Sequence, residues 1–92
     1  MLMAGGMRMN GFYFTFRSVT AAQRGQRLLS SAGIPSTMLR TPAVLSVHGC
    51  GHCLRVSSHW AAQAANALQG SGVQRCYMRN GDRFEEAQGD LL

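Results

Sequence analysis

The local patterns of this chain alternate between strand and helix in the order β-α-β-β-α-β, and this order limits the possible fold more than any other feature. A strand is predicted at Phe12–Phe16, because aromatic and β-branched residues favour strands and its three phenylalanines fall on one face. A helix is predicted at 19–32, with Ser18 as its N-cap and Gly33 after its end. Gly25 either weakens this helix or allows it to pack close to the sheet.

The second half of the chain continues the same order. Further strands are predicted at 36–40, 54–56 and 73–78, and a second helix at 59–69. Pro42 ends the first of these strands, and Ser57 or Ser58 caps the helix. Asn80-Gly81 favours a tight turn after the last strand. Residues 82–87 then either fold back as a hairpin arm or trail away.

This order predicts an α+β domain of the ferredoxin-like type, with a four-stranded antiparallel sheet and two helices on one face. We expect the first and third strands to be parallel neighbours in the centre. The connection before the third strand would then lie at the end of the sheet that carries the C-termini of both helices. The predicted division is a disordered leader at 1–10, the domain at 11–79 and a tail or hairpin arm at 80–92. Exposed edge strands often pair, so a homodimer is a further expectation.

Length and composition fit one small domain. The chain has 92 residues, of which 46% are hydrophobic, enough for a core. The net charge of +5 comes from nine scattered arginines, whereas nucleic-acid binders usually cluster their basic residues. No apolar stretch is long enough to span a bilayer, and the first residues lack the pattern of a signal peptide. We therefore expect a cytoplasmic protein that binds neither nucleic acid nor membranes.

One segment carries most of the reactive side chains. Residues 48–53, which we name the thiol segment, have the sequence His48-Gly49-Cys50-Gly51-His52-Cys53. In a cytoplasmic protein a close cysteine pair is more often redox-active or metal-binding than a structural disulfide. Gly49 and Gly51 shape the predicted loop and let other molecules approach Cys50 closely.

Two interpretations of this segment use both of its cysteines. In the first, Cys50 and Cys53 form a redox dithiol, because C-x-x-C spacing closes a small disulfide ring. Protein disulfide isomerases use the same tetrapeptide, but at the start of a helix, whereas a strand is predicted here. In the second, these cysteines bind a metal with help from His48 or His52 and from His59 or Cys76. No second spaced pair of ligands is clear, and we predict neither a metal nor another cofactor.

Two further interpretations give the cysteines separate roles. The Cys50 thiolate could carry a sulfane sulfur or selenium atom, with Cys53 assisting its release, since such chemistry needs an accessible thiol near positive charge. The candidates for stabilising the thiolate are His48, His52, Arg40 and Arg55. The last interpretation is a structural cysteine, which we expect for Cys76 within its strand.

Several motifs occur in an order that is typical of one family. They are the opening strand with Ser18, Ala32-Gly33-Ile34-Pro35, Pro42, Cys50-Gly51-x-x-Leu54-Arg55 and the strand at 73–77. From about Phe12 to Met78 the chain thereby resembles the Se/S carrier-like proteins, a small domain of many anaerobic bacteria. The resemblance implies a sulfur or selenium carrier centred on Cys50, with donor and acceptor proteins as partners. Many members lack a cysteine at the position of Cys53, so the dithiol interpretation stays open, as does the question of enzymatic turnover.

Overall fold

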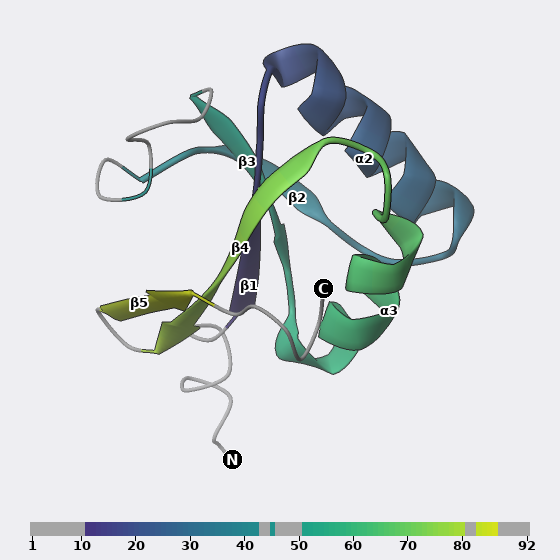
Figure 1. Ribbon diagram of the computed structural model, residues 1–92. Coiled ribbons are helices and arrows are strands. Elements are labelled where there is room, and N and C mark those ends of the chain that lie inside the picture. The colour runs from purple at the N-terminus through teal and green to yellow at the C-terminus, as the bar shows by residue number, and fades with distance from the viewer. Residues whose placement is uncertain (1–10, 43–44, 46–50, 81–82, 87–92) are drawn as a thin grey trace.

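The computed structural model describes residues 11–42, 45, 51–80 and 83–86, and forms one sheet with two helices packed on it (Figure 1). In chain order the elements are β1 (Gly11–Phe16), α2 (Val19–Ser31), β2 (Thr37–Arg40), β3 (His52–Val56), the 3-10 turn η2 (Ser58–Trp60), α3 (Ala61–Ala67), β4 (Val73–Asn80) and β5 (Arg83–Glu86). The strand order is β2-β3-β1-β4-β5, and every neighbouring pair is antiparallel. None of the helices described is long and apolar enough to cross a membrane.

The predicted α+β class and the order of the first six elements are confirmed. The prediction of four strands is wrong, because Arg83–Glu86 folds back on β4 as a fifth strand. The prediction that the first and third strands are parallel is also wrong: β1 and β3 are central neighbours, but Phe12 pairs with Val56 and Thr15 with Cys53. The physical reason is that α2 returns the chain so that β2 runs parallel to β1, and the direct connection from β2 to β3 then reverses the chain direction. The ferredoxin-like assignment itself stays a prediction.

The first helix begins and ends as its sequence signals predict. The Ser18 side chain accepts a hydrogen bond from the Ala21 N–H at 3.1 Å, which satisfies one of the free donors of the first turn. Beyond the C-cap Ala32, Gly33 adopts a φ of 78°, a left-handed conformation that favours glycine. The second predicted helix is divided into η2 and the shorter α3, whose buried alanines lie against the core.

The sheet separates two hydrophobic clusters. On the face covered by the helices, which we call the helix face, Phe14 and Phe16 of β1 pack with Leu54 of β3 and with residues from both helices. On the opposite side, the outer face, Tyr13 packs with Cys53 and Leu45. Alternation along β1 thus sends successive side chains into two different cores, because neighbouring residues of a strand point to opposite faces.

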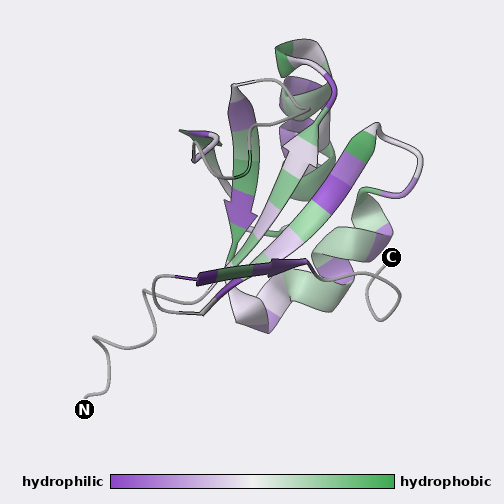
Figure 2. Cartoon of the chain, turned by 60° about the vertical axis from the view of Figure 1, so that its left-hand side comes forward, coloured by the Kyte–Doolittle hydropathy of each residue, from purple (hydrophilic) through white to green (hydrophobic). Residues whose placement is uncertain are grey.

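The fifth strand is held by side chains that cover the outer face. The Phe84 ring meets the Tyr13 ring edge to face, with centroids 5.2 Å apart, and Arg79 lies 5.6 Å from the Phe84 centroid. Glu86 accepts a 2.8 Å hydrogen bond from the Arg75 guanidinium. Figure 2 shows that β5 is mostly hydrophilic, and its apolar residue is Phe84. So polar a segment gives little sign of a strand in sequence, and Phe84 provides its apolar contact.

Replacing Gly25 by alanine tests how closely α2 approaches the sheet. A Cβ at Gly25 would lie 2.8 Å from Cζ of the buried Phe16 ring and 3.2 Å from a methyl carbon of Leu68. Overpacking of this kind costs about 1–3 kcal/mol, and the better helix propensity of alanine offsets up to about 1 kcal/mol. We expect Gly25→Ala to lower the free energy of unfolding by about 1–2 kcal/mol in urea denaturation.

Gln23→Ala is the matched control, because Gln23 is exposed on the same helix and alanine there changes only propensity. The double variant Phe16→Leu/Gly25→Ala should lose less than the sum of its single variants, since the smaller side chain makes room for the new methyl group. A stabilised Gly25→Ala protein would show that the helix is not held by this contact.

Candidate functional site

The thiol segment begins in the connection between β2 and β3 and ends inside β3. His48, Gly49 and Cys50 lie outside the described residues, whereas Gly51 is exposed and His52 and Cys53 open the strand. The prediction of a loop through Cys53 is therefore wrong for its last two residues. The Thr41 N–H donates a 2.7 Å hydrogen bond to the Gly51 carbonyl, one step beyond the paired residues Arg40 and His52. This bond fixes both ends of the connection side by side.

Leu45 ties the same connection to the outer face. Its N–H donates a 2.8 Å hydrogen bond to the Pro42 carbonyl, which forms a tight turn. Its side chain is 8% exposed and packs in the cluster that contains Cys53 and Tyr13. The connection is therefore held at its two ends and at Leu45.

The two described cysteines lie on opposite faces of the sheet. Cys53 is fully buried on the outer face, and Cys76 is fully buried in the core beneath the helices. Burial raises the pKa of the Cys76 thiol from 9.0 to about 12, so this thiol stays neutral and unreactive at physiological pH. Cys76 is a core residue, as predicted, and it cannot share a ligand with Cys53 across the sheet.

The electrostatic setting of this end of the sheet differs from the expectation. Because Thr15 pairs with Cys53, the end of β1 lies beside the start of β3, and only Arg17 and Ser18 separate β1 from α2. The N-terminus of α2 is thus at the end of the sheet where the thiol segment lies, and the prediction that both helix C-termini lie there is wrong for α2 (Figure 1). A helix N-terminus carries partial positive charge, and the first turn of α2 has no acidic residue.

The predicted thiolate-stabilising residues are placed differently from one another. Arg40 is exposed and pairs with His52, so both lie on the helix face at the end of the sheet that carries the thiol segment. Arg55 lies on the outer face, and its Cγ is 3.5 Å from a Cβ built on Gly11, at the far end of β1. The stabilising role of each stays a prediction. Sequence reasoning missed Arg17, whose position directly after the first strand was the available signal.

The metal interpretation gains nothing from the described side chains. Within residues 11–42, 45, 51–80 and 83–86, no three histidine, cysteine or acidic side chains come together as a metal site would require. His59 lies in η2, which follows the end of β3, whereas the thiol segment lies at its start. The side chain of His59 instead meets the Trp60 ring edge to face at 5.2 Å.

The sequence around this segment matches that of a known family. A family model described as "Putative Se/S carrier protein-like" matches residues 11–76. The chain belongs to this family. The match begins at the first residue of β1 and ends within β4, so the Se/S carrier-like region includes both strands that frame the thiol segment. No curated protein and no solved structure gives a significant match.

Gly51 is not required by the Se/S carrier-like fold. A Cβ at this position would meet no atom within 4 Å, and its backbone is not in the left-handed region. An open position beside Cys50 is compatible with the predicted close approach of another molecule. Packing therefore does not explain why position 51 is a glycine.

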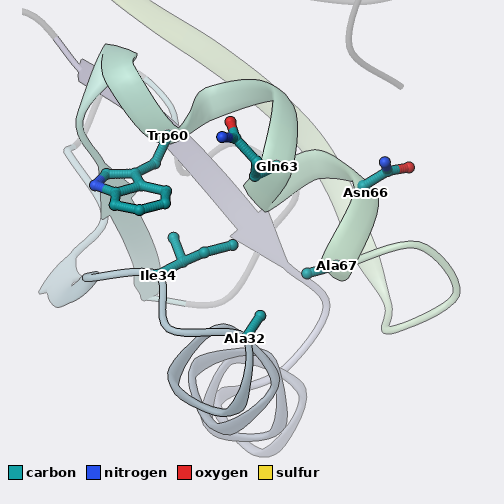
Figure 3. A pocket seen from close by; sticks show the side chains of 6 residues that line it. All are labelled: Ala32, Ile34, Trp60, Gln63, Asn66 and Ala67. Carbon is teal, nitrogen blue, oxygen red and sulfur yellow. The ribbon is translucent and has the colours of Figure 1, made fainter.

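A groove of about 410 Å³ lies between the end of α2 and α3 (Figure 3). Its lining consists of Ala32, Ile34, Trp60, Gln63, Asn66 and Ala67. The figure shows Trp60 and Ile34 facing one another, with the amides of Gln63 and Asn66 at the rim. None of the described side chains that line the groove is titratable or nucleophilic. Sequence reasoning missed this groove.

A Leu45→Ala variant tests whether the Leu45 side chain shields Cys53 from solvent. In the native protein we expect Cys53 and Cys76 to resist alkylation, because both are fully buried. Leu45→Ala removes apolar contact that contributes about 1.5–3 kcal/mol, and local opening that exposes Cys53 should become roughly tenfold more frequent or more. Peptide mass spectrometry after timed alkylation measures this rate for each cysteine.

Ile34→Ala is the control for a general loss of stability, because Ile34 is buried on the helix face and not near Cys53. It should leave Cys53 protected relative to Cys76. If Leu45→Ala exposed both thiols equally, the variant would be loosening the whole fold and the local cover would be disproved.

The raised pKa of Cys76 predicts a loss of stability at high pH. The unfolded thiol ionises near pH 9, while the folded thiol keeps its proton until about pH 12, so the folded state binds more protons between these values. Stability must therefore fall as pH rises through this range, by up to about 1.4 kcal/mol per pH unit. We expect the stability difference between wild type and Cys76→Ala to shrink from pH 8 to pH 11 in urea unfolding. A difference independent of pH would contradict the assignment.

Proposed function

We propose that the protein is a carrier that holds a sulfane sulfur or selenium atom on Cys50 and passes it between partner proteins. The observation that carries the proposal is the family match, which includes the thiol segment and the strands around it. The structure supports it by burying Cys53 and Cys76 on opposite faces of the sheet, while Cys50 directly precedes the exposed Gly51 in the sequence.

Loading is a transfer of one atom between thiols. The Cys50 thiolate attacks the outer sulfur of a donor persulfide, R–S–SH, and the S–S bond of the donor breaks. The products are the Cys50 persulfide and the donor thiolate R–S⁻, so atoms and electrons balance without an outside oxidant. A donor that bears selenium in the outer position gives the corresponding Cys50–S–SeH product.

The charges at this end of the sheet favour the thiolate form of Cys50. Arg17 and Arg40 are exposed there, and the N-terminus of α2 adds partial positive charge. No acidic residue precedes position 82, so this end of the sheet has no neighbouring carboxylate from the first eighty-one residues. Positive surroundings lower the pKa of a thiol and increase the fraction of nucleophile.

Release has two routes that Cys53 distinguishes. An acceptor thiolate can attack the outer sulfur directly, which restores the Cys50 thiolate. Alternatively the Cys53 thiolate attacks Cys50 Sγ, which expels HS⁻ and leaves a Cys50–Cys53 disulfide that a dithiol reductant must then reduce. Because Cys53 is fully buried under Leu45, the second route requires the connection to move. We assign direct transfer as the main route and the assistance of Cys53 as secondary.

The test is to load anaerobically purified protein with a small-molecule persulfide and to measure intact mass before and after reductant. Wild type should gain one or more sulfur atoms that map to Cys50 and are removed by reductant. Cys50→Ser should lose this gain almost completely, whereas Cys53→Ser should still load and should release sulfide more slowly in the absence of an acceptor.

Cys76→Ala is the matched control, since it removes a thiol that is buried on the other face of the sheet from Cys53 and should load like wild type. Equal loading of Cys50→Ser and wild type would overturn the proposal. A loss of two hydrogens on Cys50 and Cys53, with catalytic disulfide exchange, would instead assign the protein to the dithiol oxidoreductases.

A further inference from the structure

The described carboxylates of this protein, Glu85 and Glu86, lie at one edge of the sheet. All four acidic residues lie at position 82 or later, while eight of the nine arginines precede it. The acidic strand β5 forms one edge of the sheet, and β2 forms the other. Helix α2 packs on β3, β1 and β2, so it lies toward the edge opposite β5. Four arginines that look scattered in the sequence, Arg17, Arg24, Arg27 and Arg40, therefore lie away from the described carboxylates of β5.

The exposed side of α2 combines positive charge with apolar side chains. Arg24 and Arg27 are three residues apart and both exposed, so they lie on one face of the helix. Val19 is 40% exposed and Leu28 39% exposed, and these are the large apolar side chains that the described residues leave most open. Nine residues apart on an α-helix, they fall on opposite flanks of the two arginines.

The same surface continues to the end of the sheet that carries the thiol segment. Arg17 directly precedes the N-cap of α2, and Arg40 ends β2 opposite His52. We call this surface the α2 face, and its residues are Arg17, Val19, Arg24, Arg27, Leu28 and Arg40. A partner seated on the α2 face would reach the end of the sheet where Cys50 precedes Gly51.

We infer that the α2 face is the docking surface for an acidic protein that delivers the chalcogen to Cys50 or takes it away. The inference rests on the proposed function. Its chemistry follows from charge complementarity, because a surface with exposed arginines attracts a negative partner and steers it in one orientation. Exposed valine and leucine on either side of the arginines favour a protein over a nucleic acid, since protein interfaces combine arginine with apolar contacts, whereas phosphate backbones offer no partner for aliphatic groups.

The probe is a short synthetic helical peptide with glutamates along one side and leucines beside them. At low ionic strength it should bind the wild-type protein and shift the backbone amide signals of residues 17–31 and 40 in NMR titration. A second peptide, with serine in place of leucine, keeps the charge and should bind several-fold more weakly, because Val19 and Leu28 lose their contacts. Equal binding of the two peptides would reduce the α2 face to nonspecific charge and overturn the inference.

Charge reversal locates the binding surface. Arg24→Glu/Arg27→Glu should weaken peptide binding at least about tenfold. Arg75→Glu/Arg83→Glu is the matched control, because it changes net charge equally on exposed residues of β4 and β5 and should weaken binding much less. Similar losses in both double variants would contradict a localised site. Tighter binding of a single-stranded oligonucleotide at the same residues would assign the face to nucleic acid instead.

Loading of Cys50 separates this inference from the proposed function. Arg24→Glu/Arg27→Glu should load from the small-molecule persulfide like wild type, since the variant arginines serve the partner and not the thiol. If wild type failed to load, the carrier proposal would fail whatever the peptide result. If loading succeeded and the peptide did not bind the α2 face, only the docking inference would fall. A dimer that dissociates in this variant would identify β5 of a second copy as the acidic occupant and would likewise overturn the inference of a different protein.

Discussion

Burial of β1 on both of its faces is the constraint on which the other elements depend. Phe14 and Phe16 face the helices, while Tyr13 packs with Leu45 and Cys53 on the outer face of the sheet. A strand in the centre of an antiparallel sheet also has both hydrogen-bonding edges satisfied, here by β3 and β4. Any shift of β1 by one residue would exchange these two sets of side chains, so its register fixes both cores. The position of the thiol segment is set by the same register, through the pairing of Thr15 with Cys53.

The parts of the fold that sequence reasoning predicts correctly are those with local signals. The phenylalanines of β1, the Ser18 cap and Gly33 each act within a few residues, and each occupies its expected place. Strand direction and helix polarity depend on how distant segments assemble, and both expectations about β1, β3 and α2 were wrong there. The sequence does not decide whether residues 82–87 form a strand, because the apolar contact that holds Phe84 of β5 comes from Tyr13, about seventy residues earlier in the chain.

For the candidate site, the sequence predicts the residues involved better than it predicts their arrangement in space. The cysteines, histidines and glycines of the thiol segment can be recognised from the sequence alone, and the family match covers that segment. The burial of Cys53 could not be foreseen, because it depends on Leu45, a residue with no chemical signal of its own. The place of Arg17 at this end of the sheet could not be predicted either, because it depends on the order of the strands. The same is true of the separation between the arginines of α2 and the carboxylates of β5.

The hydrogen bond between Thr41 and Gly51 has a geometric consequence for the exchange of cargo. Consecutive Cα atoms are about 3.8 Å apart, so the Cα of Cys50 stays within that distance of a residue fixed to the sheet. A residue bonded to a fixed neighbour has less reach than a residue in the middle of a long connection. In the proposed carrier, donor and acceptor would therefore bring their reactive atoms to nearly the same point in space, one after the other. In such a carrier the reactive cysteine would stay in place during each transfer. Movement between transfers would come from the partners or from the whole domain.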